Sequence, residues 1–128
     1  MKLLLDTHIF LWFVGADLKL RTEWRDRIRD PDNDVFLSVA SLWEVIVKHQ
    51  QGKLPLPEPP EVYLPKMRQA HDIAALSITE EIACLLSTLP QLHKDPFDRI
   101  LICQALHLGA VLMTEDEAIK AYPIRLVS

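Results

Sequence analysis

The stretch that decides the fold is Lys2-Leu3-Leu4-Leu5-Asp6-Thr7, near the beginning of the chain. A short apolar run of this kind is typical of a buried strand. Asp6 and Thr7 close the run with polar side chains that favour a turn, and residues 9–14 then have a helix-like apolar pattern. The stretch therefore predicts a buried strand that ends at Asp6 and is followed by a helix.

The rest of the chain continues this alternation of strands and helices. Short apolar runs predict further strands over residues 35–37, 73–76, 111–113 and 124–127, the last at a sheet edge. Apolar periodicity with caps and breakers predicts helices over 18–29, from Ser38 or Ser41 to Gly52, and over 61–70, 80–89, from Pro96 to Gly109, and 115–121. Such alternation predicts an α/β fold, a mainly parallel sheet covered by helices on both faces. No repeat or boundary divides residues 1–128, so we expect a single domain.

Composition and charge exclude several classes of protein. With 128 residues, 49% of them hydrophobic and 25% charged, the chain has the composition of one globular domain. A net charge of −4 argues against a general polyanion binder, and three glycines leave no Gly-rich nucleotide loop. The apolar stretch 3–14 contains Asp6 and His8 and is too short for a bilayer, so we expect no membrane contact. Cys84 and Cys103 lie in apolar stretches and are predicted to be reduced thiols in the core, which fits a cytoplasmic protein.

Acidic residues follow the predicted strands at the points where ligands bind in parallel sheets. Asp6 directly follows the first strand, Glu44 lies in the helix after the second, and Asp116 comes three residues after the strand that ends at Met113. Asp95 and Asp98, at the start of another helix, are further candidates for the same edge. Carboxylates from distant parts of the chain are therefore predicted to converge at one edge of the sheet.

Each of these acids also has an explanation that involves no function. Asp6 is a suitable turn or N-cap residue, and Glu44 fits a capping box or a solvated helix face. Asp95 is suited to the N-cap position with Asp98 at the third helical position, and Asp116 to the acidic start of a helix. From the residues alone, both interpretations remain open.

A cluster of four carboxylates repels itself, so gathering them favours a bound cation. Oxygen donors without a matching Cys or His set favour Mg²⁺ or Mn²⁺ over Zn²⁺. No pair at metal-binding spacing occurs among the five histidines, which are His8, His49, His71, His93 and His107. The sequence also contains no Gly-x-Ser-x-Gly, P-loop or Gly-x-Gly-x-x-Gly motif, which argues against the common serine hydrolases, NTPases and dinucleotide-binding enzymes.

Four stretches together resemble the successive motifs of PIN-domain proteins, specifically the VapC-type toxins of toxin–antitoxin pairs. They are Leu4-Leu5-Asp6-Thr7-His8, Ser38-Val39-Ala40-Ser41-Leu42-Trp43-Glu44, His93-Lys94-Asp95-Pro96-Phe97-Asp98-Arg99 and Thr114-Glu115-Asp116. The resemblance covers essentially the whole chain and implies a three-layer α/β/α sandwich. It also implies a metal-dependent ribonuclease toxin that is controlled by a small antitoxin. The antitoxin would bind DNA, so that the toxin contacts DNA only indirectly.

Residue by residue, the resemblance makes Asp6 and Asp98 direct metal ligands, with Glu44 and Asp116 completing the acidic cluster. Asp95 is a further candidate for the site. Thr114 would orient groups through its hydroxyl. His93 and Arg99 carry no assigned role, and the extra acid Glu115 makes the choice of Asp116 one of alignment.

We therefore expect a Mg²⁺-dependent endoribonuclease, with Mn²⁺ as a substitute, that hydrolyses phosphodiester bonds in single-stranded or loop RNA. Its expected partners are RNA, a cognate antitoxin and a second copy of the chain in a homodimer. The apolar stretch 10–13 would offer a groove for an antitoxin helix, unless it packs into the core.

Two other functions remain as alternatives. A metal-dependent phosphohydrolase with an aspartyl nucleophile would need a second Asp two residues after the first, where this chain has His8. A catalytically silent PIN-fold binding module would keep the fold as a docking surface. An activity assay separates these alternatives from the ribonuclease.

Overall fold

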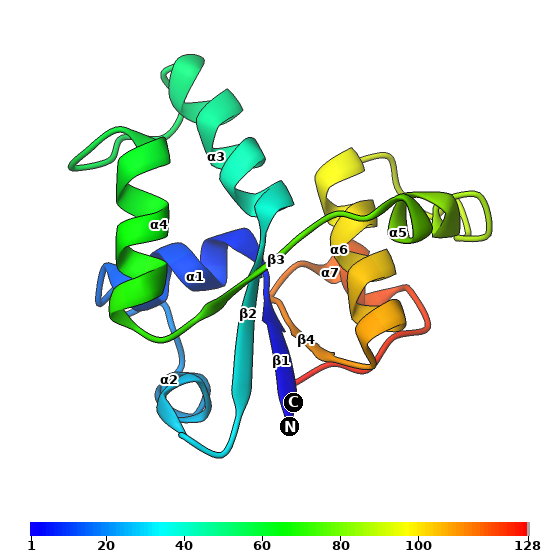
Figure 1. The fold of residues 1–128 in the computed structure, drawn as a ribbon, viewed down its shortest axis with the longest axis horizontal. Coiled ribbons are helices and arrows are strands. Elements are labelled where there is room, and N and C mark those ends of the chain that lie inside the picture. Colours follow the sequence, from blue (N-terminus) through cyan, green and yellow to red (C-terminus); the bar gives the residue numbers. More distant parts are fainter. Residues whose placement is uncertain (128) are drawn as a thin grey trace.

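A computed structural model describes residues 1–127 and has a four-stranded parallel sheet at its centre (Figure 1). The strands lie in the order β3-β2-β1-β4, so the first strand of the chain occupies a central position. Their bounds are Lys2–Leu5 for β1, Asp34–Ser38 for β2, Ala74–Leu76 for β3 and Val111–Met113 for β4. In this register Leu4 lies beside Phe36 on one neighbour and Leu112 on the other.

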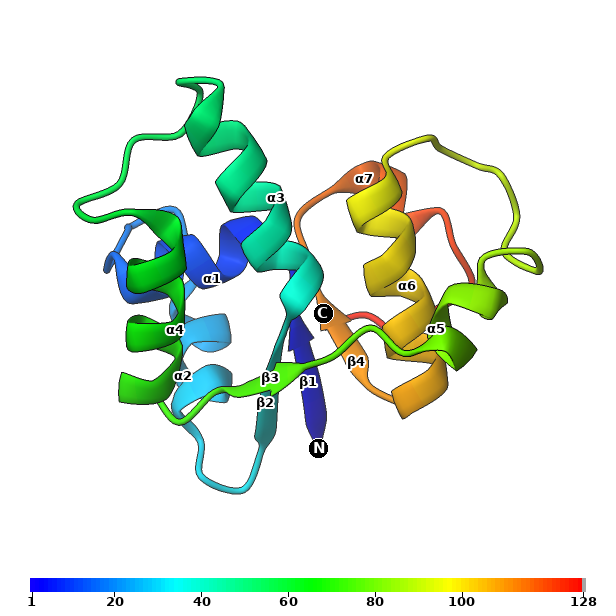
Figure 2. The ribbon, with the colours of Figure 1, turned by 45° about the horizontal axis from the view of Figure 1, so that its top comes forward.

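Helices cover both faces of the sheet, as Figures 1 and 2 show. On one side lie α1 (Thr7–Val14), α2 (Thr22–Arg29), α3 (Val39–Gln50) and α4 (Pro60–Ala70). On the other lie α5 (Glu80–Leu85), α6 (Pro96–Leu108) and α7 (Glu117–Lys120). The predicted α/β sandwich with a parallel central sheet is confirmed.

The leucine run of β1 joins the two halves of the core. Side chains alternate between the faces of a strand, and Leu3 and Leu5 pack in the cluster formed with α1 to α4. Leu4 packs in the other cluster, with α5 to α7. All three are fully buried, and burying a leucine contributes about 1.5–3 kcal/mol relative to exposing it. The apolar run thus fixes β1 between two helical layers, with Asp6 at its carboxyl end.

Four predictions about local structure are wrong. Residues 124–127 do not form a strand but one isolated bridge, between Leu126 and Leu112. Leu112 donates its backbone N–H to Arg125 and accepts one from Val127, so a single residue of β4 makes both hydrogen bonds. The helix predicted over 80–89 ends at Leu85, where the chain changes to tighter turns. Cys84 is exposed on this short helix, whereas Cys103 is buried as predicted.

The fourth wrong prediction is the groove at residues 10–13. Phe10 and Phe13 are buried in the core cluster, and Leu11 and Trp12 pack against it while remaining partly exposed. The spacing of the two phenylalanines places both on the face of α1 that meets the sheet, so core packing accounts for them.

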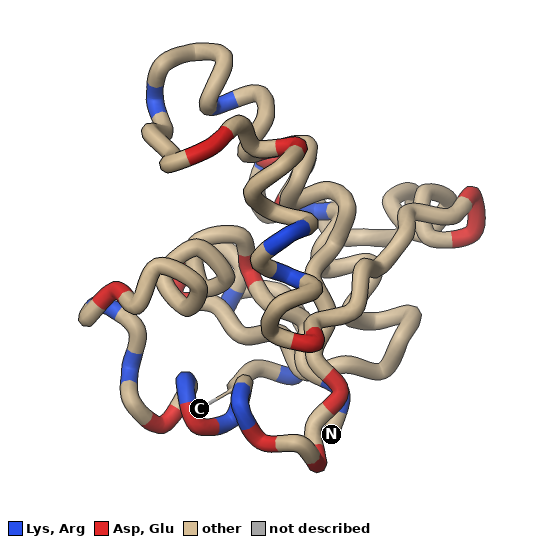
Figure 3. The backbone as a smooth tube through the Cα atoms, turned by 60° about the vertical axis from the view of Figure 1, so that its left-hand side comes forward, with Lys and Arg blue, Asp and Glu red and all other residues tan. Residues whose placement is uncertain are grey.

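Charged residues of both signs are interspersed along the backbone (Figure 3). This mixture agrees with the net charge of −4 and with the argument against a general basic binding face. Within residues 1–127, the helices are all too short or too polar to cross a membrane.

Candidate active site

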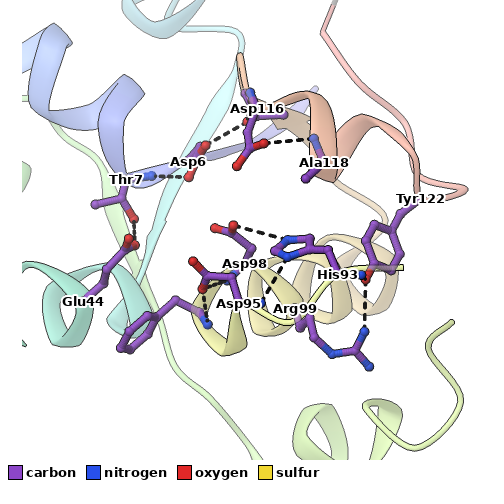
Figure 4. Close-up of polar contacts among 12 residues, drawn as sticks. Asp6, Thr7, Glu44, His93, Asp95, Asp98, Arg99, Asp116, Ala118 and Tyr122 are labelled. Carbon is purple, nitrogen blue, oxygen red and sulfur yellow. Dashed lines mark hydrogen bonds and ion pairs between the residues drawn. The ribbon is translucent and has the colours of Figure 1, made fainter. Parts of the chain in front are cut away.

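A cavity of about 270 Å³ lies at the carboxyl ends of β1 and β4. Its lining residues are mostly acidic: Asp6, Glu44, Asp95, Asp98, Glu115 and Asp116, together with His8, Ile9, Trp12 and Lys48. The structure therefore brings together all five acids that the sequence pointed to, and adds Glu115. Figure 4 shows several of them around one space.

Asp6 has both of the roles that the sequence left open. It is the N-cap of α1, where its Oδ1 accepts a hydrogen bond of 2.7 Å from the backbone N–H of Thr7. Its Oδ2 accepts a second one of 2.8 Å from the hydroxyl of Thr114. Burial raises the pKa of Asp6, the two hydrogen bonds oppose this rise, and the charge of Glu44 adds to it. Capping therefore fixes the orientation of a carboxyl group that also lines the cavity.

Glu44 is buried, so the solvated helix face is the wrong explanation for it. Ser38 is the N-cap of α3, which makes Ser41 the third helical residue and excludes Glu44 from a capping box. The hydroxyl of Thr7 donates to Glu44 Oε1 at 2.7 Å and lies 2.9 Å from the hydroxyl of Ser41. Thr7, which sequence reasoning did not single out, therefore connects the end of β1 to the acid on α3.

Lys48 is the only lysine or arginine among the residues that line the cavity. It lies one helical turn after Glu44, and its ammonium group donates to Glu44 Oε2 at 2.6 Å. Burial alone would lower the pKa of Lys48, but this hydrogen bond and the charges of Glu44, Asp95 and Asp98 raise it above its usual value. The sequence signal was the i, i+4 spacing of an acid and a lysine, which sequence reasoning did not use.

Asp95 and Asp98 both stand at the start of α6, but their surroundings differ. Asp95 is the N-cap, and its Oδ1 accepts from the backbone N–H groups of Phe97 at 2.9 Å and Asp98 at 3.2 Å. Asp98 is only 7% exposed. Burial, followed by the charges of Asp6, Asp95, Glu44 and Asp116, raises the pKa of Asp98 to about 8. Burial and repulsion within the cavity thus both favour the protonated form of Asp98.

The loop after β4 brings in Thr114, Glu115 and Asp116. The hydroxyl of Thr114 donates to Asp6 and accepts a hydrogen bond of 3.0 Å from the backbone N–H of Asp116. Asp116 is the N-cap of α7, and its side chain is exposed at the cavity. Glu115 instead pairs with Arg21, whose Nε lies 3.0 Å from Glu115 Oε1. Since Arg21 offsets the charge of Glu115, Asp116 is the better candidate of the two for binding a cation.

His93 lies beside the two acids of α6, and no role was assigned to it from the sequence. Its Nδ1 accepts a hydrogen bond of 3.0 Å from the backbone N–H of Asp95, and its Nε2 lies 3.3 Å from Asp98 Oδ2 (Figure 4). The hydroxyl of Tyr122 accepts hydrogen bonds from the backbone N–H of His93 at 3.1 Å and from Arg99 at 3.0 Å. The only sequence signal was the closeness of His93 and Arg99 to the two acids.

The donor set of the cavity suits a hard divalent cation, because its acidic side chains offer carboxylate oxygens and no thiolate. Over residues 1–127, no three His, Cys, Asp or Glu side chains are close enough to form a ready coordination shell. The acids thus line one cavity, but their side chains do not converge closely enough to coordinate one ion as they stand. A bound cation would relieve the repulsion that raises the pKa of Asp98.

Two curated relatives are ribonucleases by name, and both come from Mycobacterium tuberculosis strain H37Rv. Ribonuclease VapC16 is 38% identical over 56 residues, a match that spans 44% of this chain and only 40% of that protein. Ribonuclease VapC22 is 24% identical over 120 residues, which cover 93% of this chain and 90% of that protein.

Solved structures share the fold over the whole chain. VapBC2 from Rickettsia felis, bound to a DNA fragment from the promoter, matches with a TM-score of 0.74 and 15% identity, covering 100% of this chain and 98% of that chain. VapBC-1 from nontypeable Haemophilus influenzae matches with a TM-score of 0.66 and 21% identity, and the match covers 100% of this chain and 98% of that chain. The PIN domain model matches residues 3–124. The two curated relatives described above are both named as VapC ribonucleases. Since the family match spans nearly the whole sequence, the protein belongs to the PIN domain family.

Proposed function

We propose that this PIN-domain protein is the toxin of a VapBC-type toxin–antitoxin pair and acts as a Mg²⁺-dependent endoribonuclease, with Mn²⁺ able to replace Mg²⁺. The observation that carries the proposal is the acidic cavity at the carboxyl edge of the sheet, lined by carboxylates from four separate parts of the chain. The names of the relatives, both VapC ribonucleases, support the same activity.

In this proposal the acids have distinct tasks. Asp6 and Asp98 bind the cation directly, and Glu44 and Asp116 complete the acidic set. Asp95 acts mainly as the cap that holds the start of α6. When bound, the cation lowers the pKa of a water molecule and neutralises charge that develops on the scissile phosphate. Thr114 and Thr7 keep the carboxyl groups of Asp6 and Glu44 oriented through the hydrogen bonds described above.

Single-stranded or loop RNA is the proposed substrate. Aromatic rings can stack on unpaired bases, which duplex RNA does not offer to a small cleft. Trp12 and His8 line the cavity beside the acids, and their rings lie edge to face with centroids 6.4 Å apart. Lys48 is the cationic group of the same cavity and can approach the phosphate backbone.

The proposal predicts cleavage that depends on a divalent cation. Purified protein should cleave single-stranded RNA in Mg²⁺ or Mn²⁺, and EDTA should stop the reaction, because the acids repel the RNA phosphates unless a cation lies between them. The measurement is the rate at which a labelled RNA is cut, followed by gel electrophoresis. Cleavage that continues unchanged in EDTA, in a preparation checked for contaminating nucleases, would contradict the proposal. Absence of any cleavage with either metal would favour a silent binding module.

The proposed protein partner is an antitoxin, with DNA reached through it and a homodimer as the working form. The structural neighbours support the antitoxin, since one of them is described as a toxin–antitoxin complex from Klebsiella pneumoniae. Expression of this chain alone should therefore arrest growth, whereas co-expression with the antitoxin gene should restore it. The readout is the colony count after induction. Growth without arrest, despite soluble protein that cuts RNA in vitro, would count against the toxin role.

A further inference from the structure

The imidazole of His93 is held between the two acids of α6, at a point where it can control how Asp98 faces the cavity. Asp95 donates its backbone N–H to Nδ1 of His93 at 3.0 Å. A ring nitrogen that accepts a hydrogen bond carries no proton, so the ring proton of His93 lies on Nε2. Nε2 is therefore a donor, and it lies 3.3 Å from Asp98 Oδ2.

This Nε2 atom is buried, and within residues 1–127 it has no well-aligned hydrogen-bond acceptor. Asp98 Oδ2 lies within reach at 3.3 Å, but the geometry of the contact does not meet the requirement for a hydrogen bond. A buried donor without an acceptor is destabilising, because it has lost its hydrogen bond to water without gaining another. A small turn of the Asp98 carboxyl group would supply the acceptor, and Figure 4 shows this group pointing between His93 and the cavity.

The ring of His93 is supported from behind. Its backbone N–H donates to the hydroxyl of Tyr122 at 3.1 Å, and the two rings lie edge to face with centroids 6.0 Å apart. Arg99 donates to the same hydroxyl at 3.0 Å and also to the carbonyl oxygen of Pro90 at 2.9 Å. Contacts from the loop before α6, from α6 itself and from the turn after α7 thus fix the position of the imidazole.

We infer that His93 is a positioning residue, whose Nε2–H holds Oδ2 of Asp98 so that the other carboxyl oxygen is directed to the cation. The inference rests on the proposed function, since it assigns the cation to Asp98. Groups behind metal ligands generally act in this way, and their loss typically lowers metal affinity about 10–100-fold.

Two substitutions separate this role from simple support of the loop. In His93→Asn, the side-chain oxygen takes the place of Nδ1 and keeps the bond from Asp95, but no donor reaches Asp98. In His93→Gln, the amide nitrogen reaches the place of Nε2, while the bond from Asp95 is lost. A positioning role predicts that Gln preserves cation binding and Asn does not, and a role in holding the loop predicts the opposite.

The experiment is a titration of the full chain with Mn²⁺, in which free Mn²⁺ is followed by electron paramagnetic resonance. We expect the dissociation constant to rise about tenfold or more in His93→Asn and to stay within about threefold of the unsubstituted protein in His93→Gln. The matched control is His107→Asn, a histidine on α6 outside the cavity, which should leave the dissociation constant unchanged. Thermal melts in EDTA establish that each variant is folded.

The outcomes distinguish the inference from the proposed function. Failure of the unsubstituted, folded protein to bind Mn²⁺ overturns both. If the unsubstituted protein binds Mn²⁺, two results would overturn the inference alone. One is unchanged Mn²⁺ binding by His93→Asn, and the other is a tenfold loss of affinity in His93→Gln. If His93→Asn does not fold, His93→Gln decides by itself, because support of the loop alone predicts a loss there.

Discussion

Asp6→Asn is expected to lower the rate of RNA cleavage on the order of a thousandfold while the fold is kept. The proposed cation stabilises developing charge by several kcal/mol, and each 1.36 kcal/mol corresponds to about a tenfold change in rate. Asparagine retains an oxygen for the N–H of Thr7, and the hydroxyl of Thr114 can turn from donor to acceptor toward the new amide. The substitution therefore removes the charge of Asp6 and keeps its capping contact. Single-turnover cleavage of a labelled RNA at saturating Mg²⁺ measures the effect.

The matched control for this prediction is Asp26→Asn. Asp26 is exposed on α2 and outside the cavity, so its substitution changes the net charge equally and should leave the rate unchanged. A folded Asp6→Asn protein that retains more than about a tenth of the original rate would show that Asp6 does not bind the essential cation.

The gathering of the acids could be predicted from the sequence because of how parallel sheets are built. Carboxyl ends of parallel strands share one edge, so Asp6 after β1 and the loop with Asp116 after β4 were expected at that edge, and the pairing of β1 with β4 brings them together. Capping and site positions also coincide here, since Asp6, Asp95 and Asp116 are all N-caps. What the sequence left open as two competing explanations is, for these residues, one arrangement that orients a carboxyl group and exposes it to the cavity. Their roles in binding a cation stay predictions.

Partners of the acids could not be predicted, because each depends on contacts between elements far apart in the chain. Helical periodicity places Glu44 opposite the apolar stripe of α3. Only the packing of α1 against α3 buries Glu44 and brings the hydroxyl of Thr7 to its carboxylate. The contact of Tyr122 with His93 likewise joins residues 29 positions apart. The wrong prediction of a strand at residues 124–127 also concerns a contact between distant elements. An apolar pattern indicates that a segment can form a strand, but it does not show how many residues of the neighbouring strand will pair with it, and here only Leu112 does.

Removal of the charge at position 98 is expected to stabilise the metal-free protein, and to do so more strongly as pH rises. In EDTA, the folded protein holds the Asp98 proton up to about pH 8, whereas the unfolded chain releases it near its ordinary pKa of 3.8. Between these values the folded state binds more protons, so the contribution of Asp98 to the free energy of unfolding falls as pH rises, by up to about 1.4 kcal/mol per pH unit. The amide introduced by Asp98→Asn resembles the protonated carboxyl group at every pH, and the substitution therefore removes this fall.

Thermal melts in EDTA from pH 4 to pH 8 measure the difference between the two proteins. The melting temperatures should be similar near pH 4 and diverge as pH rises, with Asp98→Asn higher by at least about 5 °C near pH 8. Asp6, whose pKa is raised in the same direction, is present in both proteins, and its repulsion of Asp98 is part of the difference that the comparison measures. Mg²⁺ should raise the melting temperature of the unsubstituted protein at pH 8, because it binds only the folded state, and should do so much less in Asp98→Asn. Parallel curves in EDTA would show that burial and the neighbouring charges do not raise the pKa of Asp98, and an equal gain from Mg²⁺ in both proteins would place the cation elsewhere.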